Sequence, residues 1–231
     1  MAELLSCDAT HIMETRMKKY EVIIFDLDGT LSNSGEGITK CAQYALSKFG
    51  IEETQDNLKH FVGPPLKEEF MNYYHFSDEM AAEAVAIYRE RYKPIGIYET
   101  SLYPNTVEML TQLKNAGKYL AIATSKPQPM AEEVLRYLKI YDFFDKIMGA
   151  DVIGPKQSKQ SVLEALFEEI EIKDKTTYIM IGDTKFDIIG ANLVGVDSMG
   201  VSYGYGDKEE MLGLGALCVA DTTLEIAQIL L

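Results

Sequence analysis

From Tyr20 onward, short apolar runs alternate along the chain with segments of helical periodicity. Runs of this kind, ended by turn residues, are typical of strands that are buried on both faces of a sheet. They occupy residues 21–27, 119–124, 146–149, 178–182, 197–201 and 217–220. Strands that alternate with helices pair in parallel and carry helices on both faces. The sequence therefore predicts an α/β fold built on a parallel sheet.

One long stretch, residues 34–98, contains no strand-like run. Its helical segments cover residues 36–49, 67–74 and 78–92. We interpret it as an α-helical cap inserted into a core formed by residues 17–33 and 99–231. Ligands of open parallel sheets bind at the carboxyl ends of the strands, so the cap should lie over the site. Residues 1–16 lack periodicity and are interpreted as an N-terminal extension without an assigned function.

The charge balance and the cysteines exclude several classes of protein. A formal net charge of -14 in 231 residues disfavours binding to a nucleic-acid polymer or an anionic membrane, which requires clustered Lys and Arg. Cys7, Cys41 and Cys218 are too scattered for a disulfide framework or a clustered metal site. No apolar run reaches the ~18 residues of a membrane span. We expect a cytoplasmic protein that is a monomer or a homodimer.

Two acids, Asp26 and Asp28, lie at the end of the first predicted strand. Residues two apart in a strand point the same way, so both carboxylates should face the region above the sheet. Bringing them together costs free energy unless a cation or a shared proton offsets the repulsion, and Mg²⁺ is the simplest cation. Gly29 would let the backbone turn closely under a phosphate. A simple turn at Asp28-Gly29 remains an alternative. A calcium loop is excluded, because Gly37 stands where the closing Glu is needed.

The segment Phe25-Asp-Leu-Asp-Gly-Thr-Leu31 resembles the first motif of the haloacid dehalogenase-like hydrolases. The resemblance implies a Rossmann-like parallel sheet with helices on both faces and an inserted helical cap. It also implies that Asp26 is the nucleophile and that Asp28 is the general acid and base. The backbone carbonyl of Asp28 would help to hold Mg²⁺, and Leu27, Asp28 and Gly29 would surround the phosphate.

Later segments resemble the remaining motifs in order. Residues 122–126 resemble the second motif, in which Thr124, with Ser125 beside it, would bind the phosphoryl group. Lys159 is the candidate for the third motif, where a cation cancels the charge of phosphate and nucleophile, although Lys156 lies only three residues earlier. A strand-end Thr and a lone Lys are also ordinary structural features.

Residues 181–187 resemble the fourth motif. Asp183 and Asp187 are four residues apart at a helix entrance and should share one face. The resemblance implies that Asp183 binds Mg²⁺ directly and that Asp187 binds it directly or through water. The alternative is that Asp183 only caps the helix.

Two further segments bear on the substrate. Val62, Gly63, Pro64 and Pro65 resemble the cap loop that enters the active site and reads the leaving group, but they also suit a simple helix connector. Residues 201–206 resemble the same region of phosphoglycolate phosphatase-like and nucleotidase-like members. Within them, Tyr203 or Tyr205 would stack on a base or pack on the surface.

Taken together, the motifs imply a Mg²⁺-dependent phosphatase that acts through an aspartyl-phosphate. Its partner would be a small phosphorylated metabolite of the phosphoglycolate or nucleoside 5'-monophosphate type. The alternatives are a phosphomutase for sugar phosphates, a pyrophosphatase, and a non-catalytic phosphate-binding or metal-binding protein. A dehalogenase is disfavoured, because carboxylate substrates would not need the metal-binding acids.

Overall fold

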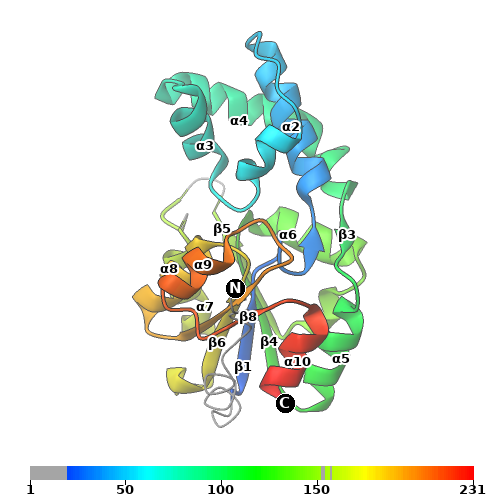
Figure 1. Ribbon diagram of the computed structural model, residues 1–231, viewed down its shortest axis with the longest axis vertical. Helices are drawn as coiled ribbons and strands as arrows, with labels where there is room; N and C mark the ends of the chain where they lie inside the picture. The colour runs from blue at the N-terminus through cyan, green and yellow to red at the C-terminus, as the bar shows by residue number, and fades with distance from the viewer. Residues whose placement is uncertain (1–19, 152–153, 157) are drawn as a thin grey trace, which may run out of the picture.

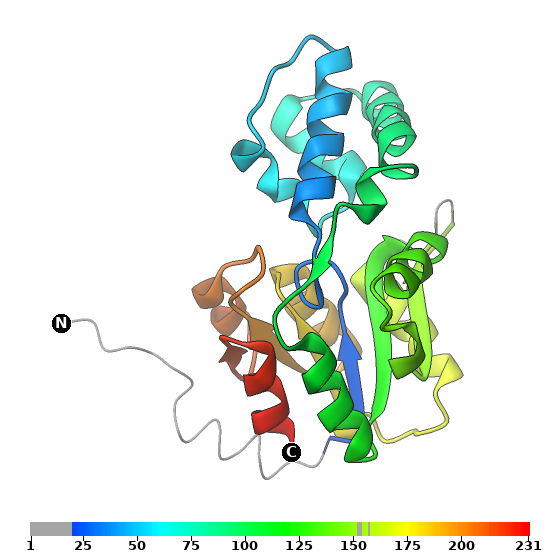
Figure 2. The same cartoon turned by 90° about the vertical axis from the view of Figure 1, so that its right-hand side faces the viewer.

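The computed structural model describes residues 20–151, 154–156 and 158–231. The interpretation of residues 1–16 as an extension falls outside the described residues. An α/β core carries a helical cap at one end, and two connecting segments join the two parts (Figures 1 and 2). No helix of the described part is long and apolar enough to cross a membrane.

The core contains a parallel sheet of six strands in the order β5-β4-β1-β6-β7-β8. This confirms the predicted α/β fold and its strands. β1 lies inside the sheet between β4 and β6, so residues that follow β1 are surrounded by the ends of neighbouring strands. The strands are β1 (Val22–Phe25), β4 (Tyr119–Pro127), β5 (Lys146–Ala150), β6 (Tyr178–Gly182), β7 (Asp197–Val201) and β8 (Val219–Ala220).

Helices cover both faces of this sheet. Successive residues of β1 enter different apolar clusters: Ile23 and Phe25 pack with α5, α6 and α10, whereas Val22 and Ile24 pack with α7 and α8. This division explains why the strand is apolar at every position instead of alternating. The core helices are α5 (Thr106–Asn115), α6 (Gln128–Tyr137), α7 (Lys159–Glu169), α8 (Lys185–Val194), α9 (Lys208–Gly213) and α10 (Thr223–Leu230), with short 3₁₀ turns η3 (Tyr141–Phe143) and η4 (Lys175–Thr177).

The regular secondary structure of the cap is helical, and the cap has its own apolar interior. Phe70 packs against Phe61 and Phe76, with ring centroids 4.8 and 5.9 Å apart. Because these rings are buried, the cap is held together by its own side chains as well as by the core. Its elements are α2 (Gly35–Lys48), η1 (Asp56–Phe61), α3 (Leu66–Tyr74), α4 (Asp78–Tyr92) and η2 (Gly96–Tyr98).

The two connections between core and cap form a short antiparallel pair, β2 (Ser32–Asn33) with β3 (Ser101–Leu102). Next to β3, Glu99 binds Arg91 of α4 at 2.7 Å and Lys40 of α2 at 3.0 Å. The pairing of β2 with β3 fixes the base of the cap above the carboxyl end of β1, and the ion pairs of Glu99 reinforce it (Figure 2).

Candidate active site

Three carboxylates from different parts of the chain meet at the carboxyl end of the sheet. Asp26 follows β1, Asp183 follows β6, and Asp187 lies in the first turn of α8. One carboxylate oxygen from each lies within 4.8 Å of the other two, and the residues are 5, 0 and 1% exposed. The structure thus brings together three of the four acids predicted to surround a metal ion.

Lys159 is the cation of this cluster. It begins α7, and its Nζ lies 2.7 Å from Asp26 Oδ1 and 2.8 Å from Asp187 Oδ1. It also donates a hydrogen bond to the carbonyl oxygen of Ala123 at 2.8 Å. Lys156, the alternative, instead lies 3.6 Å from Asp151. Of the two lysines, the structure places Lys159 beside the predicted nucleophile.

The electrostatics of the cluster are unbalanced. Burial raises the pKa of Asp26 to about 6 even though the charge of Lys159 opposes the shift. Burial and the charges of Asp187 and Asp26 raise the pKa of Asp183 well above its usual range, against hydrogen bonds from Tyr205 and Thr30. One lysine is therefore too little positive charge for three buried carboxylates.

Two glycines make this close approach feasible. A Cβ atom on Gly29, whose φ is +87°, would lie 2.1 Å from Asp183 Oδ2. A Cβ on Gly182 would lie 2.1 Å from Asp187 Cγ. Side chains at these positions would displace two of the three carboxylates. The N–H of Gly29, predicted to face a phosphate, donates to the carbonyl of Ser32 at 2.8 Å.

The donor set of the cluster fits a hard divalent cation. Such ions take carboxylate oxygens as ligands, and their charge would offset the burial and the repulsion that raise the pKa of Asp26 and Asp183. The buried carboxylates that could ligate one are those of Asp26, Asp183 and Asp187.

Asp28 lies apart from this cluster. Its Oδ2 is 2.5 Å from Nζ of Lys126, and both side chains are buried. Its Oδ1 is also buried and has no hydrogen-bond partner within the described residues. The carboxylate of Asp28 is therefore engaged by a lysine of the chain, and its predicted role towards Mg²⁺ would rest on its backbone carbonyl.

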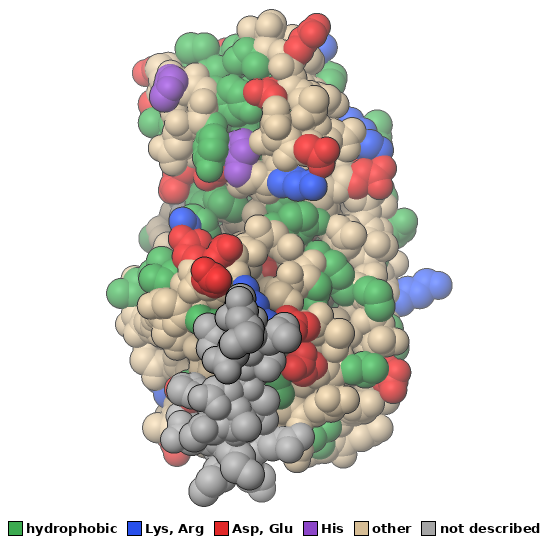
Figure 3. Space-filling model, viewed as in Figure 1, with side chains coloured by type: hydrophobic (Ala, Val, Ile, Leu, Met, Phe, Trp, Pro, Cys, Tyr) green, Lys and Arg blue, Asp and Glu red, His purple; other side chains and the backbone are tan. Residues whose placement is uncertain are grey.

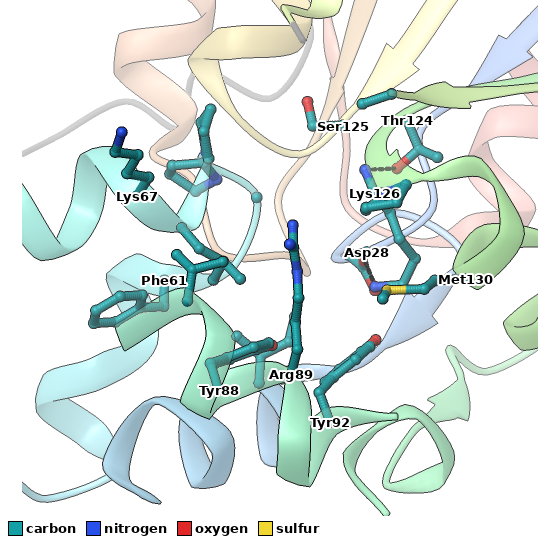
Figure 4. A pocket seen from close by; sticks show the side chains of 18 of the residues that line it. Asp28, Phe61, Lys67, Tyr88, Arg89, Tyr92, Thr124, Ser125, Lys126 and Met130 are labelled. Atoms are coloured by element: carbon teal, nitrogen blue, oxygen red, sulfur yellow. Dashed lines mark hydrogen bonds and ion pairs between the residues drawn. The ribbon is translucent and has the colours of Figure 1, made fainter. Parts of the chain in front are cut away.

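A cavity of about 440 Å³ separates core and cap at this point (Figure 4). Asp26, Asp28, Thr124 and Ser125 line it from the core. From the cap loop, Gly63, Pro64 and Pro65 line it, together with Leu66 and Lys67 of α3. A Cβ on Gly63 would lie 3.2 Å from Thr184 Cγ2, so this loop lies close to the core beside the acidic cluster. Val62, predicted with these residues, is buried in the apolar interior instead.

Residues 23–201 match the haloacid dehalogenase-like hydrolase family. The chain belongs to this family. It is 39% identical over 194 residues to a 5'-nucleotidase of Pseudomonas aeruginosa, covering 84% of this chain and 87% of the relative. It is 30% identical over 223 residues to a phosphoglycolate phosphatase of Vibrio vulnificus, covering 93 and 97%. A solved structure of a predicted phosphatase from Clostridium acetobutylicum matches with a TM-score of 0.88 and 40% identity, covering 91 and 98% of the two chains.

Together these relatives identify the chain as a haloacid dehalogenase-like phosphatase, a phosphoric monoester hydrolase. The matched region includes the acids at the carboxyl ends of β1 and β6, and these acids are the ones that converge below the cap.

The sequence analysis did not single out the polar cap residues that line the hydrolase cavity, Tyr88, Arg89 and Tyr92 of α4, and it gave no role to Lys126 at the end of the second motif. Figure 4 shows Arg89 extending from α4 into the space between the cap loop and Asp28. Within the described residues, Arg89 has no ion-pair partner. The spacing of Tyr88 and Tyr92, four residues apart on one helix face, was the available signal.

Tyr203 and Tyr205 of the hydrolase bind the segment that leads from β1 to the cap. Tyr205 donates its backbone N–H to Asp183 Oδ2 at 2.9 Å and its hydroxyl to Asn33 Oδ1 at 2.7 Å. Tyr203 donates its hydroxyl to the carbonyl of Thr30 at 3.0 Å. Neither ring lines the cavity. Of the two interpretations, packing therefore describes these rings better than stacking on a base.

Proposed function

We propose that the chain is a Mg²⁺-dependent phosphatase for small phosphate monoesters that acts through an aspartyl-phosphate on Asp26. The observation that carries the proposal is the position of the Asp26 carboxylate. It lies at the floor of the cavity, beside two further buried carboxylates and one lysine. A carboxylate in this setting suits a nucleophile more than a structural ion pair.

Asp26, Asp183 and Asp187 would hold the ion, with the carbonyl of Asp28 as a further ligand. When bound, the ion supplies positive charge that neutralises the phosphate and polarises its P–O bonds. Lys159 adds a second positive charge next to Asp26. Burial lowers the pKa of Lys159, but the charges of Asp187 and Asp26 raise it by more. The net pKa of Lys159 is therefore raised, and the side chain stays protonated.

The reaction proceeds in two displacements. A carboxylate oxygen of Asp26 attacks phosphorus while the bond from phosphorus to the leaving oxygen breaks, and that oxygen takes the electron pair and a proton from Asp28, which enters this step in its acid form. Water then attacks the phosphorus of the aspartyl-phosphate, gives a proton to Asp28 and restores the Asp26 carboxylate as inorganic phosphate leaves. Splitting the hydrolysis in this way lowers each barrier.

The phosphoryl group is placed by the remaining motif residues. Thr124 is 1% exposed and lines the cavity beside Ser125, so its hydroxyl is positioned to donate a hydrogen bond to a phosphoryl oxygen. In the structure this hydroxyl oxygen accepts a hydrogen bond from the backbone N–H of Lys126 at 3.2 Å. That bond fixes the Thr124 side chain and leaves its proton for the substrate.

The cavity supports a small phosphorylated metabolite as the substrate. About 440 Å³ is in the range of small-molecule sites and can hold either a nucleoside or the smaller glycolate group. Arg89 lines the cavity without an ion-pair partner among the described residues, which favours a polar or anionic leaving group. The relatives named 5'-nucleotidase and phosphoglycolate phosphatase represent these two sizes of substrate.

The test is a phosphate-release screen with Mg²⁺ and with excess chelator. The substrates are phosphoglycolate, nucleoside 5'-monophosphates, sugar phosphates and pyrophosphate. We expect release from at least one monoester, with pyrophosphate a poorer substrate, and loss of the activity with chelator. Stimulation by added sugar bisphosphate would indicate a phosphomutase. No release from any monoester, or equal rates with chelator, would contradict the proposal.

A further inference from the structure

The ion pair of Asp28 and Lys126 is buried beside the reaction centre. The side chains are only 9 and 6% exposed, and the ammonium lies 2.5 Å from Asp28 Oδ2. Lys126 belongs to β4 and follows Thr124 and Ser125, so the backbone that places the phosphate-binding hydroxyls also places this cation. A lysine this deeply buried needs partners on every side.

The second partner of Lys126 comes from the cap. Its Nζ lies 5.1 Å from the ring centroid of Tyr92, near the end of α4. Tyr92 is 3% exposed and stacks on Tyr88, with centroids 5.3 Å apart. The ammonium thus contacts a core carboxylate and a cap ring, as Figure 4 shows for Asp28, Lys126 and Tyr92. Movement of the cap away from the core would expose it to water.

This arrangement leaves one oxygen of Asp28 free. Oδ2 is occupied by Lys126, whereas the buried Oδ1 has no hydrogen-bond partner in the described part of the chain. A buried carboxylate oxygen without a donor is costly, because its hydration is lost and not replaced. Since Asp28 lines the cavity, we expect its carboxyl group to meet the leaving group or the attacking water when substrate is bound.

We propose that Lys126 and Tyr92 form a clamp between core and cap that fixes the Asp28 carboxylate for proton exchange with the reacting groups. Asp28 is then correctly aimed only while α4 of the cap lies over β4 of the core. Both residues are positioning residues, because they act through Asp28. The inference rests on the proposed phosphatase function and extends it to Tyr92, which lies outside the motifs, and to Lys126, which the second motif includes without a role.

A double-mutant cycle tests the clamp with p-nitrophenyl phosphate and Mg²⁺. Asp28→Asn should lower kcat/KM by ~10²–10⁴-fold, the usual contribution of a general acid or base. In the native background, Lys126→Met and Tyr92→Leu should each lower kcat/KM roughly 10-fold or more. In the Asp28→Asn background, each should cost less than about 3-fold, because a residue that acts through Asp28 has nothing left to position.

Controls separate the clamp from a general loss of structure. Lys208→Met removes an exposed lysine that pairs with Asp221 at 3.0 Å and should leave kcat/KM unchanged in both backgrounds. Thermal unfolding shows whether each variant folds, and Tyr92→Leu carries the test if Lys126→Met does not fold. Equal losses in both backgrounds would overturn the clamp while leaving the phosphatase proposal intact. An inactive wild-type protein would instead reject the phosphatase proposal and the clamp with it.

Discussion

Asp26 and Asp28 are two residues apart, yet the structure gives them opposite charge environments. Around Asp26, three buried carboxylates share the single ammonium of Lys159, which leaves a formal surplus of two negative charges. Around Asp28, one carboxylate faces the one ammonium of Lys126, and the charges balance. The first group requires positive charge from solution, whereas the second is neutralised within the chain.

This difference separates two roles that the sequence spacing alone does not separate. A cluster with surplus negative charge can bind a divalent cation, because the cation offsets the charge of the carboxylates. A phosphate can then bind, because the cation attracts it. A balanced pair can orient a carboxylate and move a proton without competing for the cation. The partner lysine, more than the position of the acid in the motif, decides which role each carboxylate suits.

The largest effect is expected from Asp26→Asn. The substitution removes the nucleophile but keeps the shape of the side chain, so turnover should fall by at least ~10³-fold while the fold persists. Rates of p-nitrophenyl phosphate hydrolysis and thermal unfolding curves provide the measurement. Asp142→Asn, at an exposed position, is the matched control and should be neutral. Normal turnover by a folded Asp26→Asn variant would reject the covalent mechanism.

A smaller effect is expected from Lys159→Met, with Lys156→Met as its control. Lys159 contacts Asp26 and Asp187, whereas Lys156 contacts Asp151. Loss of one preorganised charge at the reacting group typically costs ~10²–10³-fold in kcat, so Lys159→Met should show this loss and Lys156→Met should not. The same phosphatase assay distinguishes them. A greater loss for Lys156→Met would reverse the assignment of the third motif.

The smallest effect concerns stability without metal. The folded protein raises the pKa of Asp26 from 3.8 to about 6, and that of Asp183 also rises. Such groups bind protons more tightly when folded, so their stabilisation is complete at low pH and is lost as pH rises through about 6. Between about pH 5 and 7.5, Tm of the chelator-treated protein should therefore fall by roughly 4–8 °C.

Added Mg²⁺ should largely cancel this decrease, because it favours the ionised carboxylates. Asp183→Asn should also make the metal-free profile flatter, since it removes one of the repelling charges. Differential scanning calorimetry at several pH values gives the result. A Tm of the metal-free protein that is constant or increases over this range would show that the cluster is not strained by its charge.

The sheet and the acidic cluster could be predicted because their signals are local. Each motif acid follows an apolar strand, and parallel strands bring their carboxyl ends to one edge, so Asp26 and Asp183 were expected to meet. By sequence, the lysine of the third motif could be narrowed only to Lys156 or Lys159. The selection of Lys159 depends on how α7 packs against β4 and β5, which local periodicity does not encode.

The cavity wall could not be predicted to the same extent. Lys126 and Tyr92 meet because α4 of the cap lies over β4, a contact between residues 34 positions apart in separate parts of the fold. In the cap loop, Gly63 lines the cavity while its neighbour Val62 points into the apolar interior. Neighbours in a tight turn diverge in this way, and sequence shows the turn but not its orientation.

Calorimetric titration of Mg²⁺ into the wild-type, Asp28→Asn and Asp183→Asn proteins tests the central claim most directly. The surplus charge around Asp26 predicts that the wild-type protein binds Mg²⁺. It also predicts that Asp28→Asn retains this affinity within a few-fold and that Asp183→Asn loses ~100-fold or more. Unchanged binding by Asp183→Asn, or an equal loss in Asp28→Asn, would contradict the division of the site into a metal-binding cluster and a self-neutralised pair.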